Sequence, residues 1–151
     1  MRASTKYATA VQICIFLKHM PYQVMSSTTM AKSVNTNPVV IRRLIQELRN
    51  HEIIASSSGA KGGFFLAKSA AEISLWDIYL ATREEEFFKR PKINPECIVS
   101  SNLKALVHDV FTEAEMAMQS RLEQTSIADL NNNLTGLIGR ESATEAIKSG
   151  K

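Results

Sequence analysis

The fold of this chain is decided by residues 28–66, which read TTMAKSVNTNPVVIRRLIQELRNHEIIASSSGAKGGFFL. Asn37 can cap a helix that begins at Pro38. Four apolar residues then recur at the spacing of one buried helix face: Ile41, Leu44, Ile45 and Leu48. A shorter helical pattern over 28–34 and an Asn-Thr-Asn turn precede this helix, and a glycine-tipped hairpin follows it. This order of elements predicts a winged helix-turn-helix.

The second helix of this pattern also carries a polar face. Five side chains point outward together over about two and a half turns: Val39, Arg42, Arg43, Gln46 and Asn50. Arginine and glutamine make two-pronged hydrogen bonds to guanine and adenine edges in the major groove. A merely solvated surface face is the alternative interpretation, but the helix-turn-helix context favours DNA reading.

Further DNA contacts are expected around this helix. Helix N-termini commonly donate to DNA phosphates, so Lys6, at the start of a first helix over residues 4–20, is a candidate. The hairpin glycines do not form a phosphate-binding loop, because GAKGG lacks a Gly-Lys-Ser or Gly-Lys-Thr ending and leads into a strand. As a wing, the hairpin places Lys61 near a phosphate or the minor groove. The expected DNA-binding set is Lys6, Thr28, Thr29, Asn37, Val39, Arg42, Arg43, Gln46 and Lys61.

Charge is divided unequally along the chain. Residues 1–66 hold eight Lys or Arg against two Glu, a net charge of +6, whereas residues 67–151 have a net charge of −3. A basic half joined to a mildly acidic half indicates a polyanion-binding module attached to something that does not touch the polyanion.

Length and composition set the class of protein. The 151 residues, 44% of them hydrophobic, suffice for one domain with an accessory element. Two cysteines exclude a disulfide framework. No apolar run approaches the roughly 18 to 20 residues of a membrane span, and no signal-peptide pattern is present. A cytoplasmic protein with no membrane partner is expected.

The predicted fold is mainly α with a small β-hairpin wing, and a long helix follows the winged domain. We expect the winged helix-turn-helix over 1–82, a connector over 83–97, a dimerisation helix region over 98–135 and a frayed tail over 136–151. The long helix, 98–122, carries an apolar seam best buried against a copy of itself, and a short helix over 126–134 follows. The expected dimer contacts are Leu103, Leu106, Val110 and Met118. Packing of this seam within the chain is the alternative.

Catalytic and metal-binding patterns are weak. The three histidines stand on three different predicted helices without good ligand partners, and no Ser-His-Asp, paired-carboxylate or Cys-His spacing stands out. The sequence therefore predicts no enzyme, no metal site and no cofactor.

The two cysteines receive different interpretations. Cys14 lies on an apolar helix face and is expected to be a small buried hydrophobe. Cys97 lies between Pro95 and the start of the long helix, where a helix N-terminus lowers a thiol pKa and favours the reactive thiolate. Neighbouring Glu96 acts in the opposite direction. Cys97 is thus a possible redox switch, and a bystander cysteine is the alternative.

The assembled pattern resembles the Rrf-type family of bacterial transcription regulators, which includes IscR, NsrR and CymR. The resemblance covers nearly the whole chain. It rests on STKYA at 4–8, NTNPVVIRRLIQELR at 35–49, the wing GAKGGFFLAK at 59–68, ISLWDIYLA at 73–81 and ECIVSSNL at 96–103. It implies a homodimer joined by the long helix, with two winged domains reading a palindrome and with base-reading positions at Val39, Arg42 and Arg43.

Two departures from the family pattern stand out. Many members hold a [2Fe–2S] cluster with three closely spaced cysteines near the start of the long helix, whereas this chain has only Cys97 there. Because such a cluster needs roughly four ligands, cluster sensing is not expected. Ser58 precedes the wing glycine where some relatives have an arginine, so Lys61 is the replacement candidate for minor-groove contact.

The expected function is a sequence-specific DNA-binding transcription regulator, a repressor that binds a palindromic operator as a homodimer. One alternative is a dimerising interaction protein that titrates a related regulator without reading DNA itself, although the pair Arg42 and Arg43 speaks against it. Another is a small enzyme using Cys97, which lacks a nearby base in the pattern. No residue pattern names the inducing small molecule or oxidant.

Overall fold

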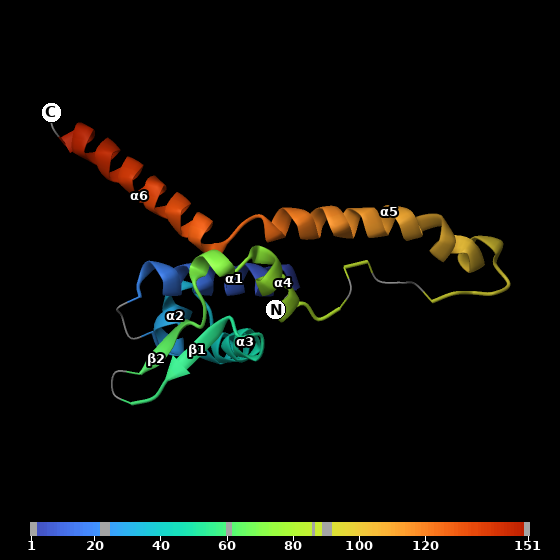
Figure 1. The fold of residues 1–151 in the computed structure, drawn as a ribbon, viewed down its shortest axis with the longest axis horizontal. Helices are drawn as coiled ribbons and strands as arrows, with labels where there is room; N and C mark the ends of the chain where they lie inside the picture. The colour runs from blue at the N-terminus through green and yellow to red at the C-terminus, as the bar shows by residue number, and fades with distance from the viewer. Residues whose placement is uncertain (1–2, 22–24, 60–61, 86, 89–91, 150–151) are drawn as a thin grey trace.

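The computed structural model describes residues 3–21, 25–59, 62–85, 87–88 and 92–149, with only the backbone described for 3–4 and 141–149. Its elements, in chain order, are α1 (Ala3–His19), α2 (Ser27–Ser33), α3 (Pro38–Asn50), β1 (Ile54–Ser57), β2 (Gly63–Leu66), the 3₁₀ turn η1 (Ala70–Glu72), α4 (Leu75–Thr82), α5 (Ile98–Glu123) and α6 (Ile127–Ser149). Figure 1 shows a winged domain built from α1 to α4 and the hairpin, with α5 and α6 extending from it in different directions. The predicted mainly α fold with a small hairpin wing is confirmed.

The core of the winged domain lies where α1, α2, α3 and α4 meet. Buried side chains come from each helix, and the apolar face predicted for α3 is buried along its whole length. Burying one Leu or Ile side chain contributes about 1.5 to 3 kcal/mol, so this face accounts for the docking of a 13-residue helix. The residues with the least exposure are Ala10, Ile13, Cys14, Ile41, Leu48, Ile78 and Ile127.

Local capping sets the helix starts. Asn37 caps α3 as predicted: its side-chain oxygen accepts a hydrogen bond from the Val39 N–H at 2.8 Å, and Pro38 occupies the first turn. The cap of α2 is Ser26, whose hydroxyl accepts a hydrogen bond from the Thr29 N–H.

The wing is a two-stranded antiparallel hairpin, as the glycine pattern predicted. Its register pairs Ile54 with Leu66 and Ser57 with Gly63. A Cβ at Gly62 would lie 2.4 Å from the Ser57 carbonyl oxygen, so only glycine fits this position.

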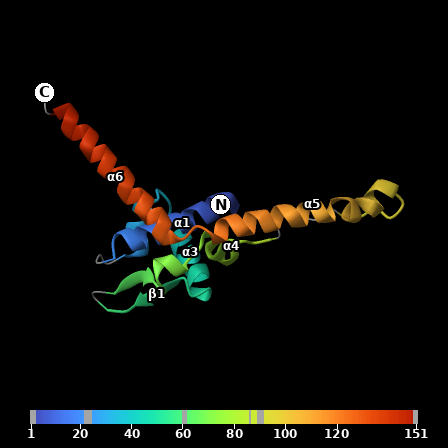
Figure 2. The same cartoon turned by 45° about the horizontal axis from the view of Figure 1, so that its top comes forward.

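The first residues of α4 and α6 are joined by backbone hydrogen bonds. Ser74 and Asp77 form a capping box at α4, and Ser126 and Asp129 cap α6 by the same pair of bonds. A β-bridge joins Ser74 to Ser126, so the two capping residues lie side by side. Figure 2 shows α5 and α6 diverging from this junction.

The last helix differs from the expectation. Helix α6 continues to Ser149 instead of ending near 134, so it includes most of the segment predicted as a frayed tail. Gly136 and Gly139 each cost only about 1 kcal/mol relative to alanine in a helix interior. Good helix formers such as Ala143, Glu145 and Ala146 follow them, which explains why the helix does not stop there.

Candidate nucleic-acid interface

The outer face of α3 is a continuous polar surface. Arg42, Arg43 and Gln46 are exposed, and Val39 is 53% exposed at the start of the helix. The Gln46 side-chain amide donates to the Asn50 side-chain oxygen at 2.9 Å, which orders the end of this face. The helix therefore presents these residues in the way that major-groove reading requires, and their contact with DNA stays a prediction.

Three further residues of the predicted DNA-binding set, Thr28, Thr29 and Asn37, lie near the turn between α2 and α3. Thr28 and Thr29 are exposed in the first turn of α2, and the Thr29 and Ser26 hydroxyls are hydrogen bonded at 2.9 Å. Asn37 is exposed but has its side-chain oxygen engaged in the cap of α3. The two threonines are exposed and their contact with phosphates stays a prediction, while Asn37 shapes the start of α3.

The wing lies on the same side of the domain as α3 (Figure 1). Phe65 is 47% exposed on its second strand. Lys61, the predicted tip residue, lies outside the described residues.

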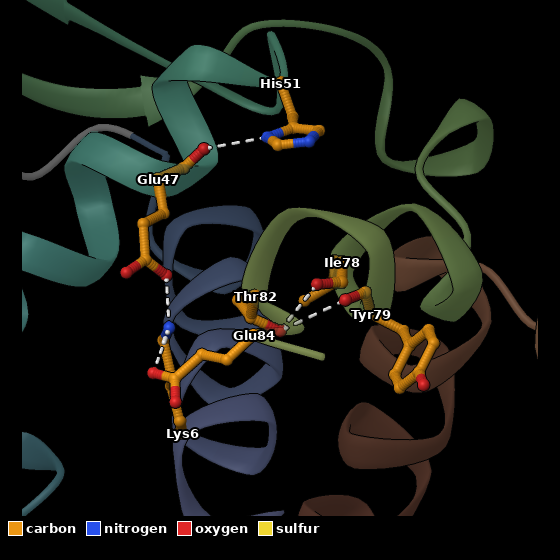
Figure 3. Close-up of polar contacts among 7 residues, drawn as sticks. All are labelled: Lys6, Glu47, His51, Ile78, Tyr79, Thr82 and Glu84. Atoms are coloured by element: carbon orange, nitrogen blue, oxygen red, sulfur yellow. Dashed lines mark hydrogen bonds and ion pairs between the residues drawn. The ribbon is translucent and has the colours of Figure 1, made fainter. Parts of the chain in front are cut away.

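Lys6 is not available to a phosphate, in contrast to the prediction. Its side chain is only 11% exposed, and its Nζ lies 3.0 Å from Glu47 Oε2 and 3.0 Å from Glu84 Oε1 (Figure 3). Burial by itself lowers the pKa of Lys6, but the two carboxylates outweigh it and raise the pKa above 10.5. The predicted phosphate contact is therefore replaced by an internal ion pair. Sequence reasoning missed Glu47 and Glu84, because neither has a spacing that points to Lys6.

The apolar residues of α5 divide between two faces. Leu106 and Val110 are 68% and 64% exposed. Val99, which lies on the same face of the helix, is also exposed. Leu103 and Met118 are half-buried and line a groove of about 710 Å³ between α4, the connector and α5. Leu103 lies seven residues before Val110, about 20° from it around the helix axis, so of the four predicted dimer residues Met118 is the one turned away from the exposed strip.

Two stacked aromatic pairs form the walls of this groove. Phe88 of the connector stacks on Phe111 of α5 with ring centroids 4.2 Å apart, and Trp76 stacks on Tyr79 within α4 at 4.9 Å. The Phe88 stack thus packs the connector against α5.

The two cysteines have opposite environments. Cys14 is fully buried, and burial raises its pKa to about 12. Cys97 is exposed at the N-cap of α5, where the backbone N–H groups of Ser100 and Val99 lower its pKa below 9.0. Within the described residues, no group of three or more His, Cys, Asp or Glu is placed to hold a metal ion.

No helix in the described part of the chain is long and apolar enough to cross a membrane.

Comparison with known proteins agrees with this geometry. The sequence profile of the Rrf2 family, described as iron-dependent transcriptional regulator, matches residues 3–133. YwnA of Bacillus subtilis (strain 168), a candidate HTH-type transcriptional regulator, is 37% identical over 111 residues, which cover 72% of this chain and 83% of YwnA.

Two solved structures share the fold. IscR of T. potens superposes with a TM-score of 0.67 at 21% identity, over 89% of this chain and 88% of IscR. The oxidised form of Staphylococcus aureus CymR superposes with a TM-score of 0.60 at 27% identity, over 87% of this chain and 96% of CymR. With the capped helix α3, a two-stranded wing and a family match over most of its length, this chain belongs to the Rrf2 family of transcription regulators and has their DNA-binding fold.

Proposed function

We propose that this regulator is a repressor that binds a palindromic duplex sequence-specifically as a homodimer. The observation that carries the proposal is the exposed face of α3, where Arg42, Arg43 and Gln46 stand on a helix fixed by the Asn37 cap and its buried apolar side. A rigid helix with arginine and glutamine on its outer face suits base recognition in the major groove.

The exposed apolar strip on α5 supports the homodimer. Val99, Leu106 and Val110 are each more than 60% exposed in the single chain. Covering such a strip with the same strip of a second copy gives a two-fold interface. Two winged domains related in this way match two half-sites one helical turn apart or a small multiple of it.

The test of this function is selection of bound sequences from random duplex DNA with the purified protein. Enrichment of one inverted repeat supports the proposal. If the protein dimerises but enriches no sequence at any salt concentration, the function is that of the dimerising interaction protein, which titrates a related regulator without reading DNA.

Iron is not part of the proposal, although the family description includes it. The chain has two cysteines in all, one buried inside α1 and one exposed at the start of α5. A [2Fe–2S] cluster needs about four ligands close together, and this pair of thiols is not such a set. The residues of this chain therefore do not fit the cluster that many family members hold.

We further propose that Cys97 is the redox-responsive residue of the regulator. The start of α5 lowers its pKa and favours the thiolate, the form that attacks peroxide. In that step the thiolate sulfur takes one peroxide oxygen, the O–O bond breaks, and hydroxide leaves, giving sulfenic acid. The CymR structure in oxidised form shows that a relative with this fold has been captured in an oxidised state.

Peroxide should change operator affinity in the parent protein and not in Cys97→Ser, and a thiol reductant should reverse the change. The reason is that Cys14, with its pKa of about 12 and its full burial, contributes no thiolate near neutral pH. The measurement is a DNA titration before and after peroxide treatment. Iodoacetamide labelling of the native protein is the matching control, with Cys97 modified and Cys14 protected. Equal peroxide responses of both proteins would make Cys97 a bystander.

A further inference from the structure

Lys6 joins three parts of the fold that are far apart in the sequence. It comes from α1, while Glu47 comes from the reading helix α3 and Glu84 from the segment directly after α4 (Figure 3). The ammonium is the least exposed of the three charged groups, and the Glu84 side chain, at 65%, is the most exposed. An ammonium in such a position is kept charged by its carboxylate partners.

Glu47 stands one helical turn after Arg43, a residue of the proposed reading face. Residues four apart on a helix are neighbours, and opposite charges at this spacing pair readily. Arg43 and the Lys6 ion pairs also border one small cavity of about 110 Å³. Glu47 therefore has two cations within reach, Lys6 of α1 and Arg43 of its own helix. The described ion pairs place its carboxylate on Lys6.

We propose that Lys6 is a positioning residue for DNA reading, which holds the Glu47 carboxylate against α1 and so leaves the Arg43 guanidinium available to DNA. The inference rests on the proposed function of α3. It assigns to Lys6 an effect on base recognition that acts through Glu47 and not through a contact between Lys6 and DNA.

The charges around Lys6 explain why its loss would matter. Glu47 Oε2 and Glu84 Oε1 each lie 3.0 Å from the same nitrogen, so they are no more than twice that distance apart. Without the ammonium, two carboxylates repel each other at this short distance. Glu84 and Glu47 would then separate, and Arg43, four residues before Glu47 on the same helix and on the border of the same cavity, is a cation that Glu47 can reach. Pairing with Glu47 would occupy the guanidinium that DNA needs.

The experiment compares Lys6→Met with Lys18→Met on the duplex enriched by the parent protein. Lys18 is an exposed lysine on the same helix, so both variants lose one positive charge. We expect Lys6→Met to bind on the order of tenfold more weakly than Lys18→Met, within the usual 5- to 150-fold range of coupled sites. Adding Glu47→Gln to Lys6→Met should restore most of this loss, because a neutral amide no longer competes for Arg43.

If the second substitution leaves the affinity loss in place or deepens it, that result overturns the proposal. Because Glu47→Gln also removes the carboxylate that Lys6→Met leaves unpaired, thermal denaturation of both variants accompanies the titration, and an affinity loss that only follows the loss of stability overturns the proposal too. Equal affinities of Lys6→Met and Lys18→Met would overturn it as well. If circular dichroism shows that Lys6→Met does not fold, Lys6→Gln replaces it, because the glutamine amide keeps hydrogen-bond donors but carries no charge. The same two affinity results then support or overturn the proposal.

A measurement without DNA tests the role of Lys6 independently of whether the protein binds DNA sequence-specifically. The Arg43 side-chain Nε–H resonance, assigned by its loss in Arg43→Lys, should shift in Lys6→Met and return in the double variant with Glu47→Gln. An unchanged Arg43 resonance in Lys6→Met would contradict the positioning role even where DNA binding is intact. If the parent protein enriches no DNA sequence, the proposed function fails, and the resonance still decides whether Lys6 keeps Glu47 from Arg43.

Discussion

Replacing Arg42 and Arg43 together with alanine should remove base-specific DNA binding while leaving the fold intact. Each arginine that makes a two-pronged contact with a base contributes about 1 to 3 kcal/mol of discrimination. If the two contributions add, the loss on the selected duplex is roughly 2 to 6 kcal/mol, or about 30-fold to 10⁴-fold. Both side chains are exposed, so no core contact is lost with them. The measurement is a titration of the selected duplex and of a scrambled duplex at matched salt.

The control for lost charge is the double variant Arg121→Ala with Arg140→Ala. These exposed arginines lie on α5 and α6, away from the reading helix, and their removal subtracts the same two charges. The control should bind the selected duplex with its preference over scrambled DNA preserved. If the Arg42 and Arg43 variant keeps parental affinity and preference, α3 does not face DNA in the way proposed.

Val110→Glu should produce monomers that lose affinity for the palindrome. Val110 is 64% exposed in the apolar strip on α5, and a charge placed there must be buried against its counterpart if the dimer forms. Splitting the dimer removes the effective concentration that links two half-sites, which is worth about 10² to 10⁴ in affinity. Because the side chain is exposed in the single chain, helical content should not change. Sedimentation and circular dichroism are the measurements.

Met116→Glu is the matched control for Val110→Glu. Met116 is also 64% exposed on α5, and six residues along a helix place it about 120° around the axis. This variant should remain a dimer and bind the palindrome. A dimeric Val110→Glu protein, or a monomeric Met116→Glu protein, would move the interface to another face of the chain.

The sequence by itself determined helix α3 and the wing hairpin. In α3 the cap, the proline at its start and the apolar spacing are all local signals, and they agree with one another, so the buried and exposed faces follow directly from the sequence. The hairpin is equally local, because Gly62 fits where no Cβ can. The N-terminal position of Cys97 on α5 was also readable, since Pro95 and the apolar periodicity mark where the helix begins.

The tertiary structure alone decided what surrounds Lys6 and the apolar side chains of α5. A lysine at a helix start is usually solvated, and only the packing of α1 against α3 and the end of α4 brings Glu47 and Glu84 to it. Leu103 and Met118 belong to the same periodic stripe as Val110, yet the connector folds back and its Phe88 stacks on α5, which turns part of the stripe inward. Helical periodicity shows that a face is apolar but does not say which neighbour covers it. That choice depends on contacts between residues distant in the sequence, which only the folded chain brings together.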